Sequence, residues 1–255
     1  MKPIYKDILA STLKGEKLLA VLIDPDKMTL DTVPSFIEKV NTSITTHIFV
    51  GGSTVDENVT DVLVEKIKKY TTLPVVLFPG DVTQITNKAD AILFLSLISG
   101  SNPEYLIGKH IASISKLKET DLDVISTGYI LIESGKKTAV ERVTGTEPLS
   151  RTNIQHIVDT AKAGELLGMK LMYLEAGSGA KLSVSKDIIL KVKKALNIPL
   201  IVGGGIRSKE QLDNAYNAGA NLVVIGTAFE ENNSFFDELN PHGALSIFPK
   251  KEKIK

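Results

Sequence analysis

Glu175 carries the side chain in this sequence that is best placed to take part in a reaction. It lies in the stretch YLEAGSGA (173–180), where a run of apolar and strand-forming residues meets a loop of small residues. A buried carboxylate costs several kcal/mol unless its surroundings compensate the charge. Glu175 is therefore either an acid that reaches solvent at a strand end, which is the common case, or an acid fixed at the mouth of a pocket.

Two glycine-rich turns, in IVGGGIRS (201–208) and VVIGTAF (223–229), are suited to binding an anion. Glycines allow backbone N–H groups to approach a phosphate closely, and a short helix starting near Thr227 would add its N-terminal dipole. Barrel enzymes commonly bind phosphate after their seventh and eighth strands. The two turns together favour a phosphate site over a structural coincidence.

The stretch LIDPDK (22–27) offers a carboxylate for a metal ion. Mg²⁺ is typically held by one or two carboxylates together with phosphate oxygens and waters, and Asp24 is suited to that part. The motif alone slightly favours the alternative, in which Asp24 caps the helix that follows. Ser53 offers a hydroxyl to the same ion, although a serine at such a position is more often a helix cap. The roles of Asp26 and Lys27 stay open.

Eight short apolar runs are predicted to be the strands that position these residues. They span 17–23, 46–52, 73–79, 91–97, 123–132, 171–177, 198–204 and 221–227. Amphipathic segments, predicted to be helices, span 29–42, 57–70, 103–118, 153–168, 184–196 and 208–218. Nearly continuous apolar strands that alternate with helices are typical of parallel strands covered on both faces. The sequence predicts an α/β fold, a (β/α)8 TIM barrel forming a single domain over residues 1–255, with an open doubly wound sheet as the second choice.

Two intervals between the predicted strands are irregular. Residues 80–90 are too few for a helix with two loops, so the third outer helix is expected to be missing or reduced to a turn. The resulting gap would either house an elongated apolar ligand or be filled by a compact crossover. Residues 133–150 form a long polar loop after the fifth strand, which is either a lid or simply flexible.

Composition excludes several classes of protein. The 30 Lys and Arg residues balance the 30 Asp and Glu residues, and aromatic residues make up 5% of the chain without any Trp, so a nucleic-acid partner is not expected. The absence of cysteine excludes disulfides and thiolate chemistry, and none of the four histidines follows a predicted strand. The N-terminus has no apolar signal-peptide core, and no apolar run approaches the length of a membrane span. A cytoplasmic protein without a transmembrane segment is expected.

Strand parity predicts where the Glu175 side chain points. Successive side chains on a strand face opposite sides, so Leu171, Tyr173 and Glu175 share one side while Met172 and Leu174 share the other. The second side is fully apolar and suits contact with helices. Tyr173 and Glu175 are therefore expected to face the barrel interior, near its mouth.

The motifs LIDPDK, GGS, YLEAGSGA, VGGGIRS and VVIGT resemble, in order and spacing, those of the geranylgeranylglyceryl phosphate synthases, a family that includes the bacterial PcrB-type heptaprenylglyceryl phosphate synthases. The resemblance extends from about residue 18 to residue 230. It implies a barrel whose third helix is replaced by a less regular segment. It also implies a Mg²⁺-dependent prenyltransferase of ether phospholipid biosynthesis, which joins a long polyprenyl diphosphate, here most closely geranylgeranyl diphosphate, to the C3 hydroxyl of sn-glycerol 1-phosphate.

The resemblance also assigns residues to the two substrates and the metal. Matching motifs assign Mg²⁺ to Asp24 and Ser53. For the mechanism we expect Glu175 and Tyr173 to be the catalytic residues, with Glu175 stabilising an allylic cation and accepting the hydroxyl proton. The sn-glycerol 1-phosphate site comprises Tyr173, Leu174, Glu175, Ala176, Gly177, Ser178, Gly179, Gly204, Gly205, Gly226 and Thr227. The prenyl chain is expected to follow the gap left by the third helix, past Phe78, Leu93, Leu95 and Leu97, with Tyr105 limiting its length.

Two features refine the resemblance, and two alternatives stay open. The loop after Tyr173 has the longer form, closer to the geranylgeranyl type, and Leu22 stands where the PcrB type has a lysine that could bind phosphate.

A homo-oligomer, dimer or hexamer, and transient contact with a membrane for product release are expected. The alternatives are a phosphosugar isomerase or aldolase barrel, and a barrel that binds a phosphorylated ligand without catalysis.

Overall fold

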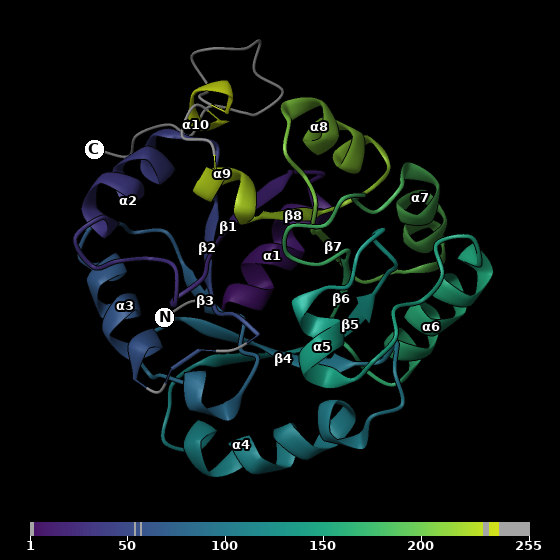
Figure 1. Cartoon of the computed structure of the whole chain (residues 1–255), viewed down its shortest axis with the longest axis horizontal. Coiled ribbons are helices and arrows are strands. Elements are labelled where there is room, and N and C mark those ends of the chain that lie inside the picture. The colour runs from purple at the N-terminus through teal and green to yellow at the C-terminus, as the bar shows by residue number, and fades with distance from the viewer. Residues whose placement is uncertain (1–2, 54, 57, 232–234, 240–255) are drawn as a thin grey trace.

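Eight parallel strands form a closed barrel in the computed structural model, which describes residues 3–53, 55–56, 58–231 and 235–239 (Figure 1). The strands pair in chain order, and β8 closes the ring by pairing with β1. Their bounds are β1 (Leu18–Ile23), β2 (His47–Val50), β3 (Val75–Leu77), β4 (Ala91–Leu97), β5 (Asp123–Leu131), β6 (Leu171–Glu175), β7 (Leu200–Gly203) and β8 (Leu222–Ile225). The predicted TIM barrel is confirmed, and the open doubly wound sheet is wrong.

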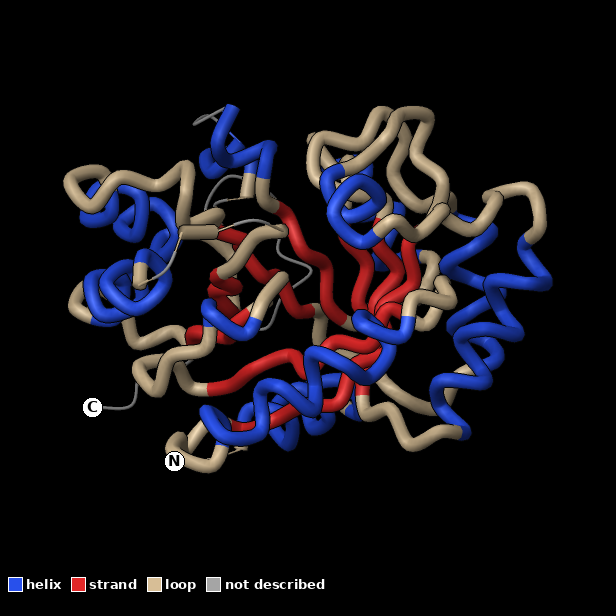
Figure 2. Tube along the Cα trace, turned by 60° about the horizontal axis from the view of Figure 1, so that its bottom comes forward, coloured by secondary structure: helices blue, strands red, loops and turns tan. Residues whose placement is uncertain are grey.

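Helices surround the strands on the outside (Figure 2), except the first, residues 4–13, which lies over the middle of the barrel (Figure 1) and packs against its inner core. They are α1 (Ile4–Leu13), α2 (Val33–Thr42), α3 (Val59–Lys68), α4 (Lys109–Leu117), α5 (Ala139–Thr144), α6 (Ile154–Leu166), α7 (Lys186–Ala195), α8 (Lys209–Asn217), α9 (Thr227–Glu231) and α10 (Phe235–Glu238). The short helix expected near Thr227 is present as α9. The helix expected from residue 29 begins instead at Val33, where Pro34 occupies the first turn that suits its fixed φ angle. The N-terminal α1 was not predicted.

The apolar residues form two cores separated by the sheet. The inner core fills the barrel and includes Leu171 and Tyr173, together with Ile4 and Ile8 of α1. The outer core lies between strands and helices and includes Met172 and Leu174. The two faces of β6 therefore have the orientation that strand parity predicted.

The crossover between β3 and β4 contains one 3₁₀ turn, η1 (Val82–Gln84), in place of an outer helix. The prediction that the third helix is reduced to a turn is confirmed. β3 and β4 are paired at only two positions, whereas β4 and β5 are paired at seven. After β4, the predicted helix 103–118 begins with a π-helical turn, η2 (Glu104–Gly108), and continues as α4. The wall of the barrel is thus thinnest beside β3 and β4.

Candidate functional site

A cavity of about 450 Å³ lies at the carboxyl ends of the strands. The residues predicted for the metal and the phosphate gather around it from β1, β2 and β6 to β8. The lining includes Asp24, Ser53, Tyr173, Glu175, Ser178, Gly179, Gly204, Gly205, Gly226 and Thr227. Residues far apart in the sequence are brought together here, as expected for the catalytic face of a barrel.

Three residues of the predicted phosphate loop do not line this cavity. The side chains of Leu174 and Ala176 are fully buried in the outer core, away from the mouth. Gly177 lies behind Glu175 and donates its backbone N–H to Glu175 Oε1 at 2.5 Å. These residues position the loop through their backbone and their packing.

The Glu175 carboxylate is buried at the mouth, with 5% of its surface exposed. Burial raises the pKa of Glu175 from its ordinary value of 4.5 to about 6, and the hydrogen bond from Gly177 and the nearby Tyr173 hydroxyl oppose this rise. The Tyr173 hydroxyl itself makes no hydrogen bond of normal geometry within the described residues. Glu175 is therefore held inside the pocket, and its carboxyl group has a pKa near neutral pH.

The position of Glu175 depends on a glycine in the loop that follows β7. Gly204 has φ +85°, and a methyl group placed on it would lie 2.4 Å from Glu175 Oε1 and 2.6 Å from the Gly177 nitrogen. Those distances are too short for any side chain. Gly204 is therefore required both by its backbone conformation and by the carboxylate that passes over it.

We expect G204A to lower the free energy of unfolding by about 2 kcal/mol, through the left-handed backbone and the displaced carboxylate. Because a displacement of about 1 Å costs roughly a hundredfold in rate, turnover should fall by about that factor. The matched control is G168A, since Gly168 has φ +94° and no atom within 4 Å of the added methyl group. G168A should lose stability and keep full turnover; equal turnover in the two variants would contradict this role of Gly204.

The glycine turns around Glu175 form an anion-binding surface. Gly177, Gly179, Gly204 and Gly205 all have φ between +65° and +98°. No acceptor for the backbone N–H groups of Gly179 and Gly205 is found among the described residues. Backbone segments with positive φ and unpaired N–H groups favour the binding of a phosphate.

Asp24 and Ser53 lie on the other side of the same cavity. Asp24 Oδ1 accepts the backbone N–H of Asp26 at 3.2 Å, and Asp24 Oδ2 is 3.6 Å from Lys27 Nζ. Within the described part of the chain, no group of three or more His, Cys, Asp and Glu side chains could hold a metal by itself. One carboxylate and one hydroxyl beside a phosphate site nevertheless fit Mg²⁺, which takes few protein ligands and completes its shell with phosphate and water.

Sequence reasoning missed the cations that surround the mouth. Lys136, Lys137 and Arg142 come from loop 133–150, and Arg207 follows β7. The loop is ordered around α5, which lies over the ends of β5 and β6 (Figure 1) and has a complete capping box between Thr138 and Glu141. The T-x-x-E spacing was the signal in the sequence from which α5 could have been found.

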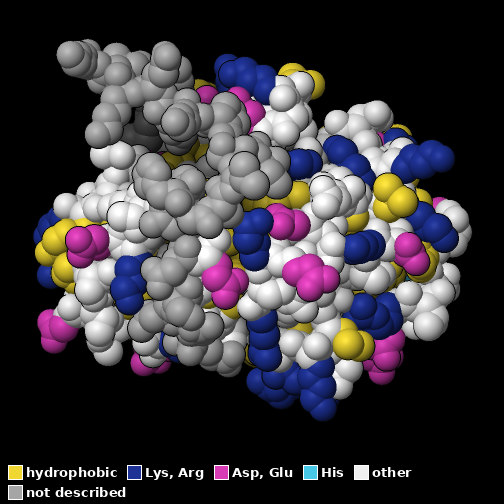
Figure 3. Space-filling view, turned by 90° about the horizontal axis from the view of Figure 1, so that it is seen from above, with side chains coloured by type: hydrophobic (Ala, Val, Ile, Leu, Met, Phe, Trp, Pro, Cys, Tyr) yellow, Lys and Arg dark blue, Asp and Glu magenta, His cyan; other side chains and the backbone are white. Residues whose placement is uncertain are grey.

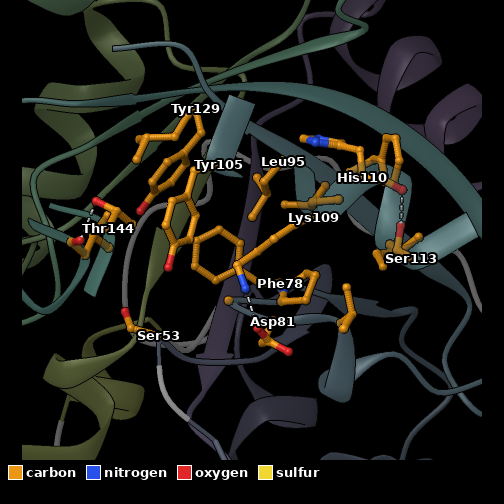
Figure 4. A pocket seen from close by; sticks show the side chains of 18 of the residues that line it. Ser53, Phe78, Asp81, Leu95, Tyr105, Lys109, His110, Ser113, Tyr129 and Thr144 are labelled. Atoms are coloured by element: carbon orange, nitrogen blue, oxygen red, sulfur yellow. Dashed lines mark hydrogen bonds and ion pairs between the residues drawn. The ribbon is translucent and has the colours of Figure 1, made fainter. Parts of the chain in front are cut away.

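A second, largely apolar cavity of about 110 Å³ opens from the mouth toward α4. Its lining includes all five residues predicted for the prenyl groove: Phe78, Leu93, Leu95, Leu97 and Tyr105. Figure 4 shows Ser53 at one end of this cavity and His110 and Ser113 at the other. Ile92 and Phe94 on the opposite face of β4 also line it, so the groove passes from the inside of the barrel to the outside beside this strand.

Aromatic rings mark the junction of mouth and groove. Phe78 and Tyr129 line both cavities. The ring centroids of Phe78, Tyr129 and Tyr173 lie 5.3 to 5.8 Å from one another. Burial raises the pKa of both tyrosines well above the ordinary value, so the hydroxyls stay protonated. Tyr129 was not predicted as a site residue, because it lies within β5 and the predicted site residues were sought at the carboxyl ends of strands.

Polar contacts lie along the rim of the groove. Lys109 Nζ pairs with Asp81 and lies 5.3 Å from the centroid of the Tyr105 ring. The Tyr105 hydroxyl donates to the Val143 carbonyl at 3.3 Å and so connects η2 to α5. Tyr105, the residue predicted to limit the length of the prenyl chain, therefore belongs to the wall between the groove and loop 133–150.

The face shown in Figure 3 carries Lys and Arg side chains interspersed with Asp and Glu. This mixture agrees with the balanced composition of the chain. Among the helices of the described residues, none combines the length and the apolar character that crossing a membrane requires.

The comparison with protein families matches residues 12–241 to the PcrB family. The geranylgeranylglyceryl phosphate synthase of Flavobacterium johnsoniae is 55% identical over 234 residues, which cover 92% of this chain and 96% of that protein. The enzyme of the same name from Zunongwangia profunda is 55% identical over 230 residues, covering 90% of this chain and 98% of that protein.

A solved structure shares the architecture as well. The crystal structure of (S)-3-O-geranylgeranylglyceryl phosphate synthase from Thermoplasma acidophilum, in complex with its substrate sn-glycerol-1-phosphate, superposes with a TM-score of 0.88 at 33% identity. The superposition covers 95% of this chain and 98% of that one.

Proposed function

Since this chain belongs to the PcrB family, we propose that it is a prenyltransferase that joins a polyprenyl diphosphate to the C3 hydroxyl of sn-glycerol 1-phosphate and releases diphosphate. Geranylgeranyl diphosphate is the proposed donor. The observation that supports this most directly is the junction of two unlike cavities: a polar mouth with a buried carboxylate opens into a groove lined by leucines. Such a pair of cavities suits one phosphorylated substrate and one long apolar substrate.

The reaction follows from the groups at the junction. The bond between C1 of the prenyl chain and the diphosphate oxygen breaks, and the electron pair leaves with the diphosphate. The rings of Phe78, Tyr129 and Tyr173 and the carboxylate of Glu175 surround the place where the allylic cation develops, and both kinds of group stabilise positive charge. The glycerol hydroxyl oxygen forms the new C–O bond and gives its proton to Glu175.

Asp24 and Ser53 are proposed to hold Mg²⁺, which when bound would neutralise charge on the leaving diphosphate. Lys27, beside Asp24, adds positive charge to the same side of the mouth. The buried rings of Tyr129 and Tyr173 exclude water, which would otherwise capture the cation.

The substitution L95W tests the assignment of the groove. Leu95 is half-buried and lines the groove, so a larger side chain there shortens the space available to the prenyl chain. We expect the KM for a C20 donor to rise at least tenfold, with a smaller rise for a C10 donor and no change in the KM for sn-glycerol 1-phosphate. Steady-state kinetics with a series of donor lengths measures this, and L190W on the exposed face of α7 is the control. A uniform rise for all donor lengths would count against the groove.

The function itself is tested by incubating the protein with Mg²⁺, sn-glycerol 1-phosphate and prenyl diphosphates of several lengths, and identifying the extracted product by mass spectrometry. The expected product is the C3 ether. The enantiomer, sn-glycerol 3-phosphate, serves as the control acceptor. Absence of any ether product from the whole series would overturn the proposal.

The two alternatives explain less of the structure. A phosphosugar isomerase or aldolase has no use for a groove lined by Leu93, Leu95 and Leu97. A barrel that only binds a phosphorylated ligand has no use for an acid buried like Glu175. Product formation in the assay above decides among the three.

Homo-oligomer formation and transient contact with a membrane stay proposals. Ile107 of η2 and Ile111 and Ile114 of α4 are 55%, 68% and 42% exposed, and their spacing places them on one side of a continuous helical segment. This apolar face suits either contact. Light scattering of the purified protein measures the oligomeric state.

A further inference from the structure

We propose that Lys136, on the loop between β5 and α6, is a binding residue for the phosphate of the glycerol substrate. The proposal rests on the proposed function and adds a side-chain cation to a phosphate site built from glycine N–H groups. It concerns a residue that no motif of the chain singles out.

The first observation is the position of the ammonium group. A methyl group placed on Gly179 would lie 3.0 Å from Lys136 Nζ, so the ammonium lies directly above the backbone of Gly179. Gly179 belongs to the loop after β6, where backbone N–H groups form the anion-binding surface. An anion held by that loop comes within reach of a charge-assisted hydrogen bond from Lys136.

The second observation is that no described residue supplies a counter-charge to the ammonium. Within the described part of the chain, Lys136 Nζ makes no hydrogen bond or ion pair. Lys27, on the other side of the mouth, already lies beside Asp24. The Lys136 ammonium can therefore bind a substrate anion without first breaking an ion pair in the protein.

The third observation is that this loop is fixed relative to the phosphate loop. Arg151 donates to the Glu133 carbonyl and to the Ser183 carbonyl, both at 2.8 Å, and so joins the two segments. The Leu182 N–H donates to the Ser134 carbonyl at 3.2 Å. The cation is thus carried on a backbone that is held close to the anion site before any ligand arrives.

The position also distinguishes between the two phosphorylated substrates. Lys136 lies over the loop after β6, next to the glycine turns after β7 and β8. Asp24 and Ser53, proposed for the metal and the diphosphate, come from β1 and β2. The phosphate of the acceptor is therefore the partner we assign to Lys136.

The test compares K136M with K136R and with the control K181M. Lys181 is exposed and lies close in sequence to the same loop, but it does not line the mouth. We expect K136M to raise the KM for sn-glycerol 1-phosphate roughly tenfold, with kcat and the KM for the prenyl diphosphate within twofold of the wild type. K136R should stay within about threefold of the wild type, and K181M should be unchanged.

Calorimetric titration with inorganic phosphate gives a readout that does not depend on turnover. K136M should bind phosphate about tenfold more weakly than the wild type. Wild-type affinity in K136M, or a rise in the KM for the diphosphate instead, overturns the assignment even if the enzyme is active. Phosphate binding that depends on Lys136 in a protein that forms no ether product would support the assignment while the proposed function fails.

Discussion

The substitution E175Q is expected to lower turnover about a thousandfold while the protein stays folded. Glutamine keeps the size of the side chain but cannot accept the hydroxyl proton or stabilise the allylic cation by its charge. Each contribution is worth roughly a hundredfold, and because both belong to one carboxylate their effects do not simply multiply. Single-turnover kinetics with both substrates measures the loss. The control is E38Q, which changes an exposed glutamate of α2 outside the site. Turnover of E175Q close to that of the wild type would remove Glu175 from the mechanism.

The same variant should be more stable than the wild type at alkaline pH. The pKa of Glu175 is about 6 in the folded protein and lies near its ordinary value of 4.5 in the unfolded chain. The carboxyl group therefore favours folding while it is protonated, and this contribution is lost as the pH rises from 4.5 through 6. At pH 8 we expect E175Q to gain about 2 kcal/mol in free energy of unfolding, and at pH 4 almost nothing. Urea denaturation at the two pH values measures the difference; a gain of the same size at both would contradict the burial of a charge.

The second large effect is expected for D24N. Asparagine retains the oxygen that accepts the Asp26 N–H but loses the negative charge proposed to hold Mg²⁺. We expect kcat to fall at least a hundredfold and the Mg²⁺ concentration that gives half-maximal rate to rise more than tenfold. Removal of Mg²⁺ by a chelator should reduce the wild type to a similar residual rate.

The control for D24N is D31N, since Asp31 is an exposed aspartate of the same connection that does not line the mouth. D31N should keep the Mg²⁺ dependence of the wild type. The role of Asp24 is refuted if D24N responds to Mg²⁺ as the wild type does. D26N, measured beside them, reports whether Asp26 contributes to the same ion.

The fold was predictable because its strands are short apolar runs that alternate with amphipathic helices. The inward direction of Tyr173 and Glu175 followed from strand parity alone, since two of their neighbours on β6 are apolar and face the helices. The missing third helix followed from the length of the 80–90 interval. Both inferences rest on geometry that every chain obeys, so the sequence was sufficient.

The cations of the mouth could not be predicted in the same way. Lys136 lies on a stretch of irregular backbone, where neither a period of two nor one of 3.6 indicates direction. The approach of the Lys136 ammonium to Gly179 depends on Arg151, which joins this loop to the segment after β6 through contacts between residues far apart in the sequence. The motif YLEAGSGA also did not show which of its residues line the mouth and which, such as Leu174, are buried in the outer core.

The two residue pairs that join β3 to β4 have a consequence for how the prenyl substrate reaches the groove. A short ladder separates at a lower free-energy cost than the seven pairs between β4 and β5, and the groove lies on both faces of β4 beside that weak seam. If the two pairs between β3 and β4 separate, a polyprenyl chain would enter the groove from the side of the barrel and would not have to pass through the polar mouth. The lipid product would leave by the same route, while the glycine loops after β6 to β8 keep their positions.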